Sequence, residues 1–352
     1  MTLALIGRTL VDDVATGMSC GQRTAAARPL EHAGPVPTEL RLPRVFDLDL
    51  LMRRGLSPTQ VRTRVQRREF LRLRRGAYCR ARDWDVAGPE ERHALEAAAY
   101  ALTHDASAPF AFSHGTAAAL HELPVATEHL EVLHLTVDPT SRLTTRRDAE
   151  VDRQVARLPV AEVRRHRGVR VTSPARTVVD CLRRLPTRDA VAVADAALRQ
   201  RLCSTAEVEA VLASQSDWPF AVVAAQALAL VDPRRESALE SRSAVVMHEH
   251  KVPTPEPQMS IHDARGRFVA RVDFAWLAFG VVGEVDGRVK YLDGAAHVIE
   301  AEKDRQARLE ALGLVVVRWD VRHLYGAEPV LVQRVMAALA RGDGRRFRGR
   351  AA

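Results

Sequence analysis

Residues 269–289 read VARVDFAWLAFGVVGEVDGRV, two runs rich in valine and aromatic residues that are joined by LAFG. Such runs around a short connection containing glycine predict an antiparallel hairpin. If LAFG is the connection, Asp273 lies opposite Glu284, with Cβ atoms about 5 Å apart, and Asp286 shares their face. Opposed carboxylates destabilise a strand pair unless a cation neutralises them. The sequence therefore predicts three converging carboxylates, a ligand set that suits Mg²⁺ or Mn²⁺.

The alternating charges after residue 283 also have a simpler interpretation, since such a pattern usually marks a solvated strand face. An interior strand is indicated instead by the valines of this stretch, Val281, Val282, Val285 and Val289. Lys290 follows Glu284 by six residues, an even number, so both side chains would point to the same face of a strand. In a regular strand it would lie about 13 Å from Asp286, so it can join the acids only through a bend, which Gly287 could supply.

Helical patterns flank this hairpin. Residues 234–250 read RRESALESRSAVVMHEH, with Glu236 and Glu240 one turn apart on the same helix face. Downstream, residues 300–313 form a charged amphipathic pattern that ends at Gly313, followed by the apolar strand pattern LVVVRWDV and a last helical pattern to residue 342. Residues 234–340 are therefore predicted to form an α/β core.

The order of these motifs resembles the DUF559 family, relatives of very-short-patch-repair-like endonucleases in the PD-(D/E)xK nuclease superfamily. The matching segments are ESALESR, RVDFAW, EVDGRVKY, AEKDRQARLEALG and VVVRW. The resemblance implies a restriction-endonuclease-like core with Asp273 and Glu284 as metal-binding acids and Glu240 as the acid of the first helix. The superfamily usually has lysine where this chain has Asp286, so either Lys290 replaces that lysine or the site is catalytically silent.

The chemistry of an active site of this kind follows from its metal. Mg²⁺ or Mn²⁺ held by Asp273 and Glu284, with Asp286 as an additional ligand, would activate water and stabilise charge on the scissile phosphate. Lys290 would orient the water or neutralise the phosphate. Glu240 would steady the site or a second metal.

A second module is predicted at residues 44–85. The segment LSPTQVRTRVQRREF begins with Ser57, Pro58 and Gln60, the residues of a capped helix start, and FLRLRRGAYCR follows as a hairpin pattern around Arg75 and Gly76. Helix, turn, helix and hairpin is the order of a winged helix-turn-helix. The expected DNA contacts are its arginines, Arg62, Arg64, Arg67, Arg68, Arg72, Arg74 and Arg75. The alternative is a solvated basic face on a protein-binding module.

Residues 90–230 are predicted to form a mixed α/β middle domain. The segments FSHGTAAALHELP, GVRVTSPARTVVDCL and AVADAALRQRLCS, together with the basic module, resemble the AbiEi-type antitoxins of type IV toxin–antitoxin systems. That resemblance implies promoter DNA and a toxin as partners. Ser113, His114, His121 and Asp180 have no spacing typical of a catalytic triad, so we expect ordinary structural roles for them.

The basic charge of the chain favours an anionic partner such as nucleic acid, and the alternative is an arginine-rich proteome. The 352 residues have a net charge of +8, and nearly all the basic charge is arginine. Four dispersed cysteines without a C-x-x-C pair favour reduced thiols and a cytoplasmic protein. No apolar run approaches the ~18 residues of a membrane helix. We expect a flexible segment at 1–40 and a basic, disordered tail at 341–352.

These observations predict a multidomain α+β and α/β protein with three parts: a winged helix-turn-helix, a mixed α/β middle domain and a restriction-endonuclease-like core. Two functions fit this organisation. One is a DNA-binding protein with a Mg²⁺-dependent endonuclease domain that hydrolyses phosphodiester bonds. The other is a non-catalytic, antitoxin-type transcriptional regulator with a degenerate nuclease fold.

Overall fold

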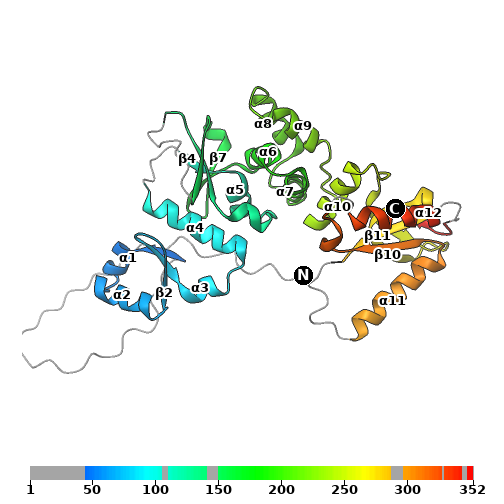
Figure 1. Ribbon diagram of the computed structural model, residues 1–352, viewed down its shortest axis with the longest axis horizontal. Helices are drawn as coiled ribbons and strands as arrows, with labels where there is room; N and C mark the ends of the chain where they lie inside the picture. Colours follow the sequence, from blue (N-terminus) through cyan, green and yellow to red (C-terminus); the bar gives the residue numbers. More distant parts are fainter. Residues whose placement is uncertain are drawn as a thin grey trace, which may run out of the picture. The chain divides into compact units, whose positions relative to one another are not determined.

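The computed structural model describes residues 44–104, 110–140, 150–286, 296–326, 329–342 and 347–351. Predictions about residues 1–40 and Lys290 lie outside these ranges. The chain divides into two compact units, which are treated separately below: residues up to 108 together with 167–169, and the remaining residues 109–166 and 170–352 (Figure 1). Among the described residues, no helix is both long enough and apolar enough to cross a membrane.

The first unit has the predicted order of helix, turn, helix and hairpin. Its three-stranded antiparallel sheet has the order β1-β3-β2. Ser57 and Gln60 form a reciprocal capping box at the start of the second helix, as expected. The elements are β1 (Val45–Asp47), α1 (Leu48–Arg53), α2 (Pro58–Gln66), β2 (Phe70–Arg74), β3 (Ala77–Arg80), α3 (Ala81–Asp85) and α4 (Pro89–Thr103).

Helix α4 differs from the sequence interpretation, which grouped its residues with the middle domain. It packs against all three strands of the first unit. Helix α4 packs there because it is amphipathic: Leu95, Ala99 and Tyr100 are buried, while its other side is polar. A short core of Phe46, Leu51, Val61 and Phe70 lies beneath α1 and α2.

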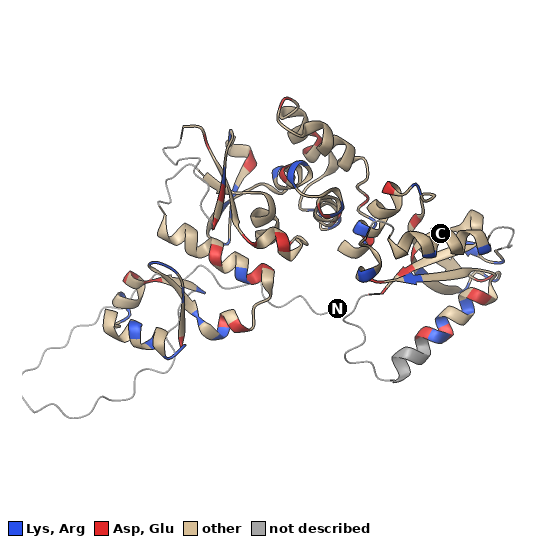
Figure 2. Ribbon diagram, viewed as in Figure 1, with Lys and Arg blue, Asp and Glu red and all other residues tan. Residues whose placement is uncertain are grey.

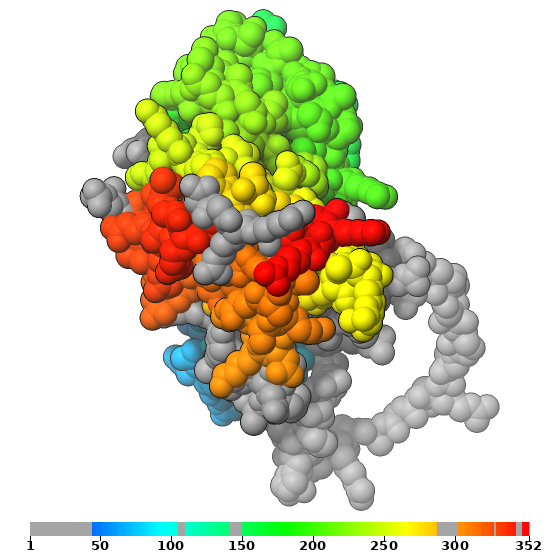
Figure 3. Space-filling model, turned by 90° about the vertical axis from the view of Figure 1, so that its right-hand side faces the viewer, coloured from blue at the N-terminus to red at the C-terminus, as the bar shows by residue number. Residues whose placement is uncertain are grey.

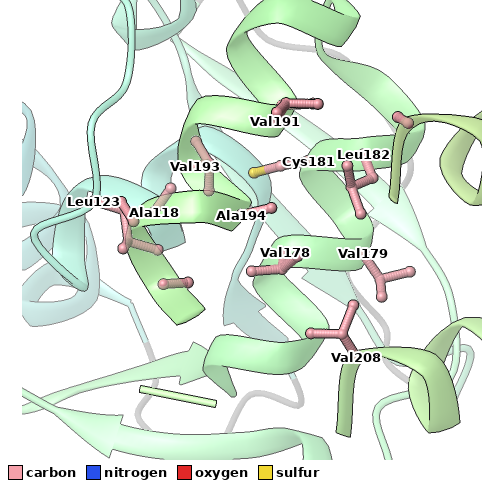
Figure 4. Packing of buried hydrophobic residues seen from close by; sticks show 14 of the residues in the cluster. Ala118, Leu123, Val178, Val179, Cys181, Leu182, Val191, Val193, Ala194 and Val208 are labelled. Atoms are coloured by element: carbon pink, nitrogen blue, oxygen red, sulfur yellow. The ribbon is translucent and has the colours of Figure 1, made fainter. Parts of the chain in front are cut away.

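The second unit begins with a mixed five-stranded sheet of order β6-β5-β4-β8-β7 and a group of helices. Its apolar core is made largely by α6 and α7, with Val178, Val179, Val191, Val193 and Ala194 packed together (Figure 4). The elements are β4 (Phe110–Phe112), α5 (His114–Leu120), β5 (Leu133–Val137), β6 (Val151–Val155), β7 (Val163–His166), β8 (Val169–Thr172), α6 (Pro174–Arg184), α7 (Thr187–Arg199), α8 (Thr205–Ser214) and α9 (Ala221–Leu228).

The C-terminal part of the second unit is a three-layer α/β/α arrangement. Its sheet has the order β12-β11-β10-β9-β13, with only the β11–β12 pair parallel. Helices α10 and α12 pack on one face and α11 on the other. The elements are α10 (Ala238–Glu249), β9 (Glu256–His262), β10 (Phe268–Trp276), β11 (Val281–Val285), α11 (Ala296–Ala311), β12 (Val315–Trp319), α12 (Val330–Gly342) and β13 (Arg350–Ala351).

The predicted register of the central hairpin is confirmed. Phe274 pairs with Gly283 and Trp276 with Val281, so Asp273 stands level with Glu284. The connection is a 3-10 turn at Leu277–Phe279 that ends at Gly280. Gly283 is required for packing, because a Cβ at this position would lie 2.6 Å from the Trp319 ring.

The prediction of a disordered tail at 341–352 is wrong for residues 341–342, which end α12, and for residues 347–351. Arg350 pairs with His262 and Ala351 with Ile261, and the Arg348 amide donates to Leu312 O at 3.0 Å. Figure 3 shows the red C-terminal residues at the surface, next to a yellow segment of the strands they extend. The physical reason is that the edge of β9 offers unpaired backbone groups, which the tail satisfies despite its Gly- and Arg-rich composition.

Candidate functional site

Glu284 is the most buried acid of the predicted site, with 4% exposure. It lies on β11 between β10 and β12, and Arg318 of β12 is its neighbour in register. Arg305 reaches Glu284 from α11, the helix on one face of the sheet. Its Nη1 lies 2.5 Å from Glu284 Oε1, and its Nη2 donates to Glu284 Oε2 at 2.7 Å. Arg318 forms an ion pair with Oε2. Burial raises the pKa of Glu284 even though both guanidinium groups oppose the shift.

Asp273 lies beside Glu284 and has a different environment. Its Oδ2 accepts the Val285 amide at 2.8 Å and its Oδ1 accepts Gln258 Nε2 at 3.3 Å. Burial raises the pKa of Asp273 to about 6; the hydrogen bond from Val285 opposes this shift, and the charges of Glu240 and Glu284 add to it. The carboxyl is therefore held between neighbouring acids with no guanidinium partner among the described residues.

Glu240 joins the same group from α10, and only 5% of its surface is exposed. It accepts hydrogen bonds from Ser237 Oγ at 2.7 Å and from the Glu236 amide at 2.9 Å, so the start of α10 fixes its carboxylate. Gln258 of β9 donates to Glu240 at 2.8 Å as well as to Asp273. Sequence reasoning missed Gln258, because it directly follows Pro257 in a mixed polar strand, EPQMSIH, where no pattern singles it out.

Two more acids surround the arginines of Glu284. Glu302 pairs with both Arg305 and Arg318. Partial burial acts to raise the pKa of Glu302, but hydrogen bonds from the two arginines outweigh it and lower the pKa to about 2. Asp286 lies 3.5 Å from Arg318. We call the five acids the acidic cluster: Glu240, Asp273, Glu284, Asp286 and Glu302.

The cluster carries an excess of acid, but among the described residues the one group of three or more metal-ligand atoms that lie within 4.8 Å of one another is found outside it. Its five carboxylates exceed the two guanidinium groups among them, and hard oxygen ligands suit Mg²⁺ or Mn²⁺. Glu284 Oε1 is buried and lies 2.5 Å from Arg305 Nη1, so this oxygen already has a cationic partner. Asp273 and Glu284 are brought together as predicted, whereas Asp286 contacts Arg318. The role of Lys290 stays a prediction.

One trio, outside the acidic cluster, has ligand atoms close enough to hold a metal within the ranges that the structure describes. The ligand atoms of Glu128, His129 and Asp189 lie within 4.8 Å of one another. However, Asp189 already accepts Arg242 Nε at 2.7 Å and pairs with His129 at 3.1 Å, and Glu128 is exposed. We interpret Asp189 as a polar link from α7 to His129 of the 3-10 turn at Thr127–Leu130 and to Arg242 of α10.

The predicted DNA-binding arginines fall into two groups. Arg64 pairs with Glu69 at 2.9 Å, Arg68 with Asp85 at 3.0 Å, and Arg74 lies over the Tyr100 ring. The other four are exposed and form no ion pair with any described acid: Arg62, Arg67, Arg72 and Arg75. Figure 2 shows basic residues along this helix and hairpin.

Helix α2 turns one polar face to solvent. Thr59, Arg62 and Gln66 are exposed, whereas Val61 on the opposite side is buried. Their spacing of three and four residues places them on one stripe of the helix. Gln66 was not among the predicted contacts, although the helical period could have found it.

The residues that resemble a triad have separate structural partners. His114 Nδ1 lies 2.9 Å from Ser113 Oγ, but His121 Nε2 is bonded to Thr172 O and Asp180 to Arg176. Burial lowers the pKa of His114 well below its usual value, and the nearby His134 adds to this shift. The expectation of ordinary roles agrees with this geometry.

The comparisons with known proteins agree with part of this organisation. Residues 108–230 match the family model described as the AbiEi antitoxin C-terminal domain. Two Mycobacterium tuberculosis proteins, uncharacterized protein MT2308 and uncharacterized protein Rv2248, are each 36% identical over 203 residues, which is 58% of this chain and 71% of theirs. The chain belongs to the family of these two proteins, and it contains an AbiEi antitoxin C-terminal domain.

A solved structure, that of the RV2827C protein from Mycobacterium tuberculosis, is a distant match. It is 17% identical, with a TM-score of 0.36, and the alignment covers 58% of this chain and 75% of that chain. The DUF559 resemblance of residues 234–340 and the winged-helix interpretation of residues 44–85 stay predictions.

Proposed function

We propose that the protein is a DNA-binding regulator of the antitoxin type, with a toxin as its protein partner. The observation that carries this proposal is the AbiEi antitoxin match at residues 108–230, directly after a unit with an exposed basic helix and hairpin. In this proposal the first unit holds promoter DNA and the AbiEi domain provides the antitoxin function.

The charge and the element order of the first unit support this proposal. The exposed stripe of α2, with Arg62 and Gln66, would face base edges, where arginine pairs with guanine and glutamine with adenine. Arg67, Arg72 and Arg75 would contact phosphates on either side. The element order supports the winged-helix interpretation, in which the second helix enters the major groove.

DNA binding is tested by fluorescence anisotropy on the promoter region of the gene. Replacing Arg62, Arg67 and Arg72 together with alanine should abolish specific binding at physiological salt and lower the slope of log affinity against log salt by about 2, since Arg67 and Arg72 are its phosphate contacts and each contributes about 0.9. The matched control replaces three exposed arginines elsewhere, Arg164, Arg201 and Arg265. Equal affinities of the two triple variants would count against DNA binding by this surface.

The antitoxin role has its own test. If a nucleotidyltransferase-like toxin is encoded beside the gene, co-expression of the full chain should restore growth of cells that express the toxin. A variant disrupted in the AbiEi core, Val191→Asp, should not restore it. If the wild-type chain and Val191→Asp restored growth equally, the AbiEi domain would not be responsible for an antitoxin function.

A second function is favoured by one specific observation, the position of Asp273 level with Glu284 in the β10–β11 register. We propose that the acidic cluster holds Mg²⁺ or Mn²⁺ for phosphodiester hydrolysis. The ion would activate water and offset phosphate charge. Asp273 and Glu284 would hold it, while Gln258 and Ser237 orient Glu240 and Asp273.

The nuclease proposal is tested with supercoiled plasmid and Mg²⁺ or Mn²⁺. Wild type should nick or linearise it, and Asp273→Asn should lower the rate at least 100-fold because the first metal ligand becomes neutral. No cleavage by wild type with either metal, or equal cleavage by both proteins, would rule out catalysis at this cluster and leave the regulator alone.

A further inference from the structure

Phe220 departs from two local rules at the start of α9. Its φ is +65°, in the left-handed region that a bulky side chain rarely adopts. It also stands at the N-cap without a side-chain hydrogen bond to the helix. The residue is 56% exposed, so burial in the core does not explain the conformation. Strained backbone that is kept at a surface points to a role in binding.

The connection that precedes this residue is fixed by α6 beneath it. Arg183 donates from Nε to Pro219 O at 3.0 Å and from Nη1 to Gln215 Oε1 at 3.2 Å. The Trp218 ring has the guanidinium groups of Arg176 and Arg183 each 4.9 Å from its centre. The aromatic side chain that follows is therefore presented from a rigid support, which lowers the entropy that its immobilisation would cost on binding.

Exposed apolar side chains continue from Phe220 along α9. Val222 and Val223 face solvent. The opposite side of the helix is buried, with Ala224 and Ala227 in the core that α6 and α7 form. Figure 1 shows α8 and α9 next to one another, with α6 and α7 on their inner side. We call the surface of Phe220, Val222 and Val223 the α9 face; grouped apolar side chains of this kind mark an interaction site.

The charge around the α9 face is negative. Residues 204–231 contain three acids, Glu207, Glu209 and Asp217, all exposed, and neither lysine nor arginine. Figure 2 shows α8 and α9 in tan and red, without blue. A second copy of the same surface would oppose like charges, and the phosphates of DNA would be repelled. The complementary partner is therefore a protein with an apolar groove and a rim of lysine or arginine.

The α9 face also lies within the part of the chain that matches the AbiEi antitoxin C-terminal domain, residues 108–230. We infer that the toxin docks on this face, with Phe220 in an apolar groove of the toxin and the basic rim of that groove beside the three acids. This inference rests on the proposed antitoxin function and names the surface that would perform it. A rigid, exposed aromatic residue is the usual energetic centre of such an interface.

Isothermal titration calorimetry with the full-length protein tests the inference. The probe is the purified toxin whose gene lies beside this one, as in the growth test. Phe220→Ala should weaken binding about 30-fold, the loss typical of an interface hot spot. The matched control is Phe268→Ala, which removes an aromatic ring from a residue of β10 with 60% exposure and should change the affinity less than twofold. Equal affinities of these two variants would overturn the inference.

Phe220→Gly separates binding from folding. Glycine adopts a positive φ without steric cost, so this variant should have a urea midpoint, measured by circular dichroism, no lower than that of wild type. Its affinity for the toxin should still fall about 30-fold, because the ring is gone. A urea midpoint well below that of wild type would show that Phe220 serves the fold and would overturn the inference.

The remaining outcomes separate the docking surface from the antitoxin role. Growth restored by the wild-type chain without a measurable complex would overturn the inference and leave the antitoxin role. No restored growth, or no toxin gene beside this one, would overturn both. Sedimentation of the protein alone tests the other occupant of the surface. A wild-type dimer that Phe220→Ala converts to a monomer would assign the α9 face to a second copy and overturn the inference.

Discussion

Asp273 shows how burial and neighbouring charge act on a single residue. Its carboxyl is placed among Glu240 and Glu284, and burial raises its pKa to about 6. An aspartate in an unfolded chain titrates near 4. Between these values the native state binds more protons than the unfolded state, so the free energy of unfolding falls as the pH rises through this window.

Replacing this carboxyl should therefore stabilise the metal-free protein. In EDTA at pH 8, Asp273→Asn should raise the free energy of unfolding by about 1 to 3 kcal/mol, since it removes the cost of burying the ionised group. At pH 4 the free energies of unfolding of wild type and Asp273→Asn should be nearly equal. Urea denaturation at both pH values measures this, with the exposed Asp304→Asn as control. A variant equally destabilised at both pH values would contradict the assigned cause.

Neighbouring side chains also decide which arginines of the first unit are available to bind DNA. The sequence treats its seven candidate arginines alike, but three contact an acid or an aromatic ring of the fold, whereas the other four are exposed and pair with no described acid. Because an ion pair with a protein acid competes with phosphate, we expect Arg62→Ala to weaken DNA binding more than Arg64→Ala. Anisotropy titrations of the two single variants at one salt concentration compare them, and the reverse order would contradict this assignment.

At the scale of elements, α2 depends on its first turn. Ser57 and Gln60 satisfy each other's backbone amides, and without them two donors at the helix start would lose their partners. The cap also fixes the start of the stripe that includes Arg62 and Gln66.

Removing the cap should cost stability rather than recognition. Ser57→Ala should lower the free energy of unfolding of the first unit by about 1 kcal/mol. Trp84, the only tryptophan of residues 44–104, gives a fluorescence signal for this unit. Ser57→Asp, which keeps an acceptor at the cap, should stay close to wild type. A stability of Ser57→Ala equal to that of wild type would show that the capping box adds nothing here.

The elements of the C-terminal sheet were predictable to different extents. The β10–β11 hairpin was predictable, because a connection of four residues leaves little freedom in the register of its strands. The alternating pattern of the strands determines which side chains share one face of the sheet. The tail strand β13 was not, since two residues have no periodicity and pair only because β9 presents an open edge.

At the scale of the whole molecule, α10 belongs to two cores. Val245 packs with the helices of the AbiEi domain, while Val246 and Met247 pack against the C-terminal sheet. Polar contacts reinforce this: Arg242 pairs with Asp189 at 2.7 Å and Arg188 with Glu249 at 2.6 Å. The helix that positions Glu240 is therefore held from both sides within the second unit.

This arrangement predicts cooperative unfolding of the second unit. Val245→Ala should lower the free energy of unfolding by about 1 to 3 kcal/mol, and hydrogen exchange should quicken in α7 and in β11 to a similar degree. Val222→Ala on exposed α9 is the control and should change neither. Faster exchange confined to α7 would show that the AbiEi domain and the C-terminal sheet unfold independently.

The sequence by itself determined the local features of this protein: the capped helix and hairpin of the first unit, the register that sets Asp273 beside Glu284, and the AbiEi-like motifs. These depend on residues within about one hairpin or one helix of each other, where periodicity and turn chemistry leave few alternatives. Only the tertiary structure decided that Arg305 and Arg318 neutralise Glu284, that Gln258 links Glu240 to Asp273, and that α10 is shared by two cores. Those contacts join distant segments, and which side chain meets which follows from how whole layers pack, a choice that no local pattern encodes.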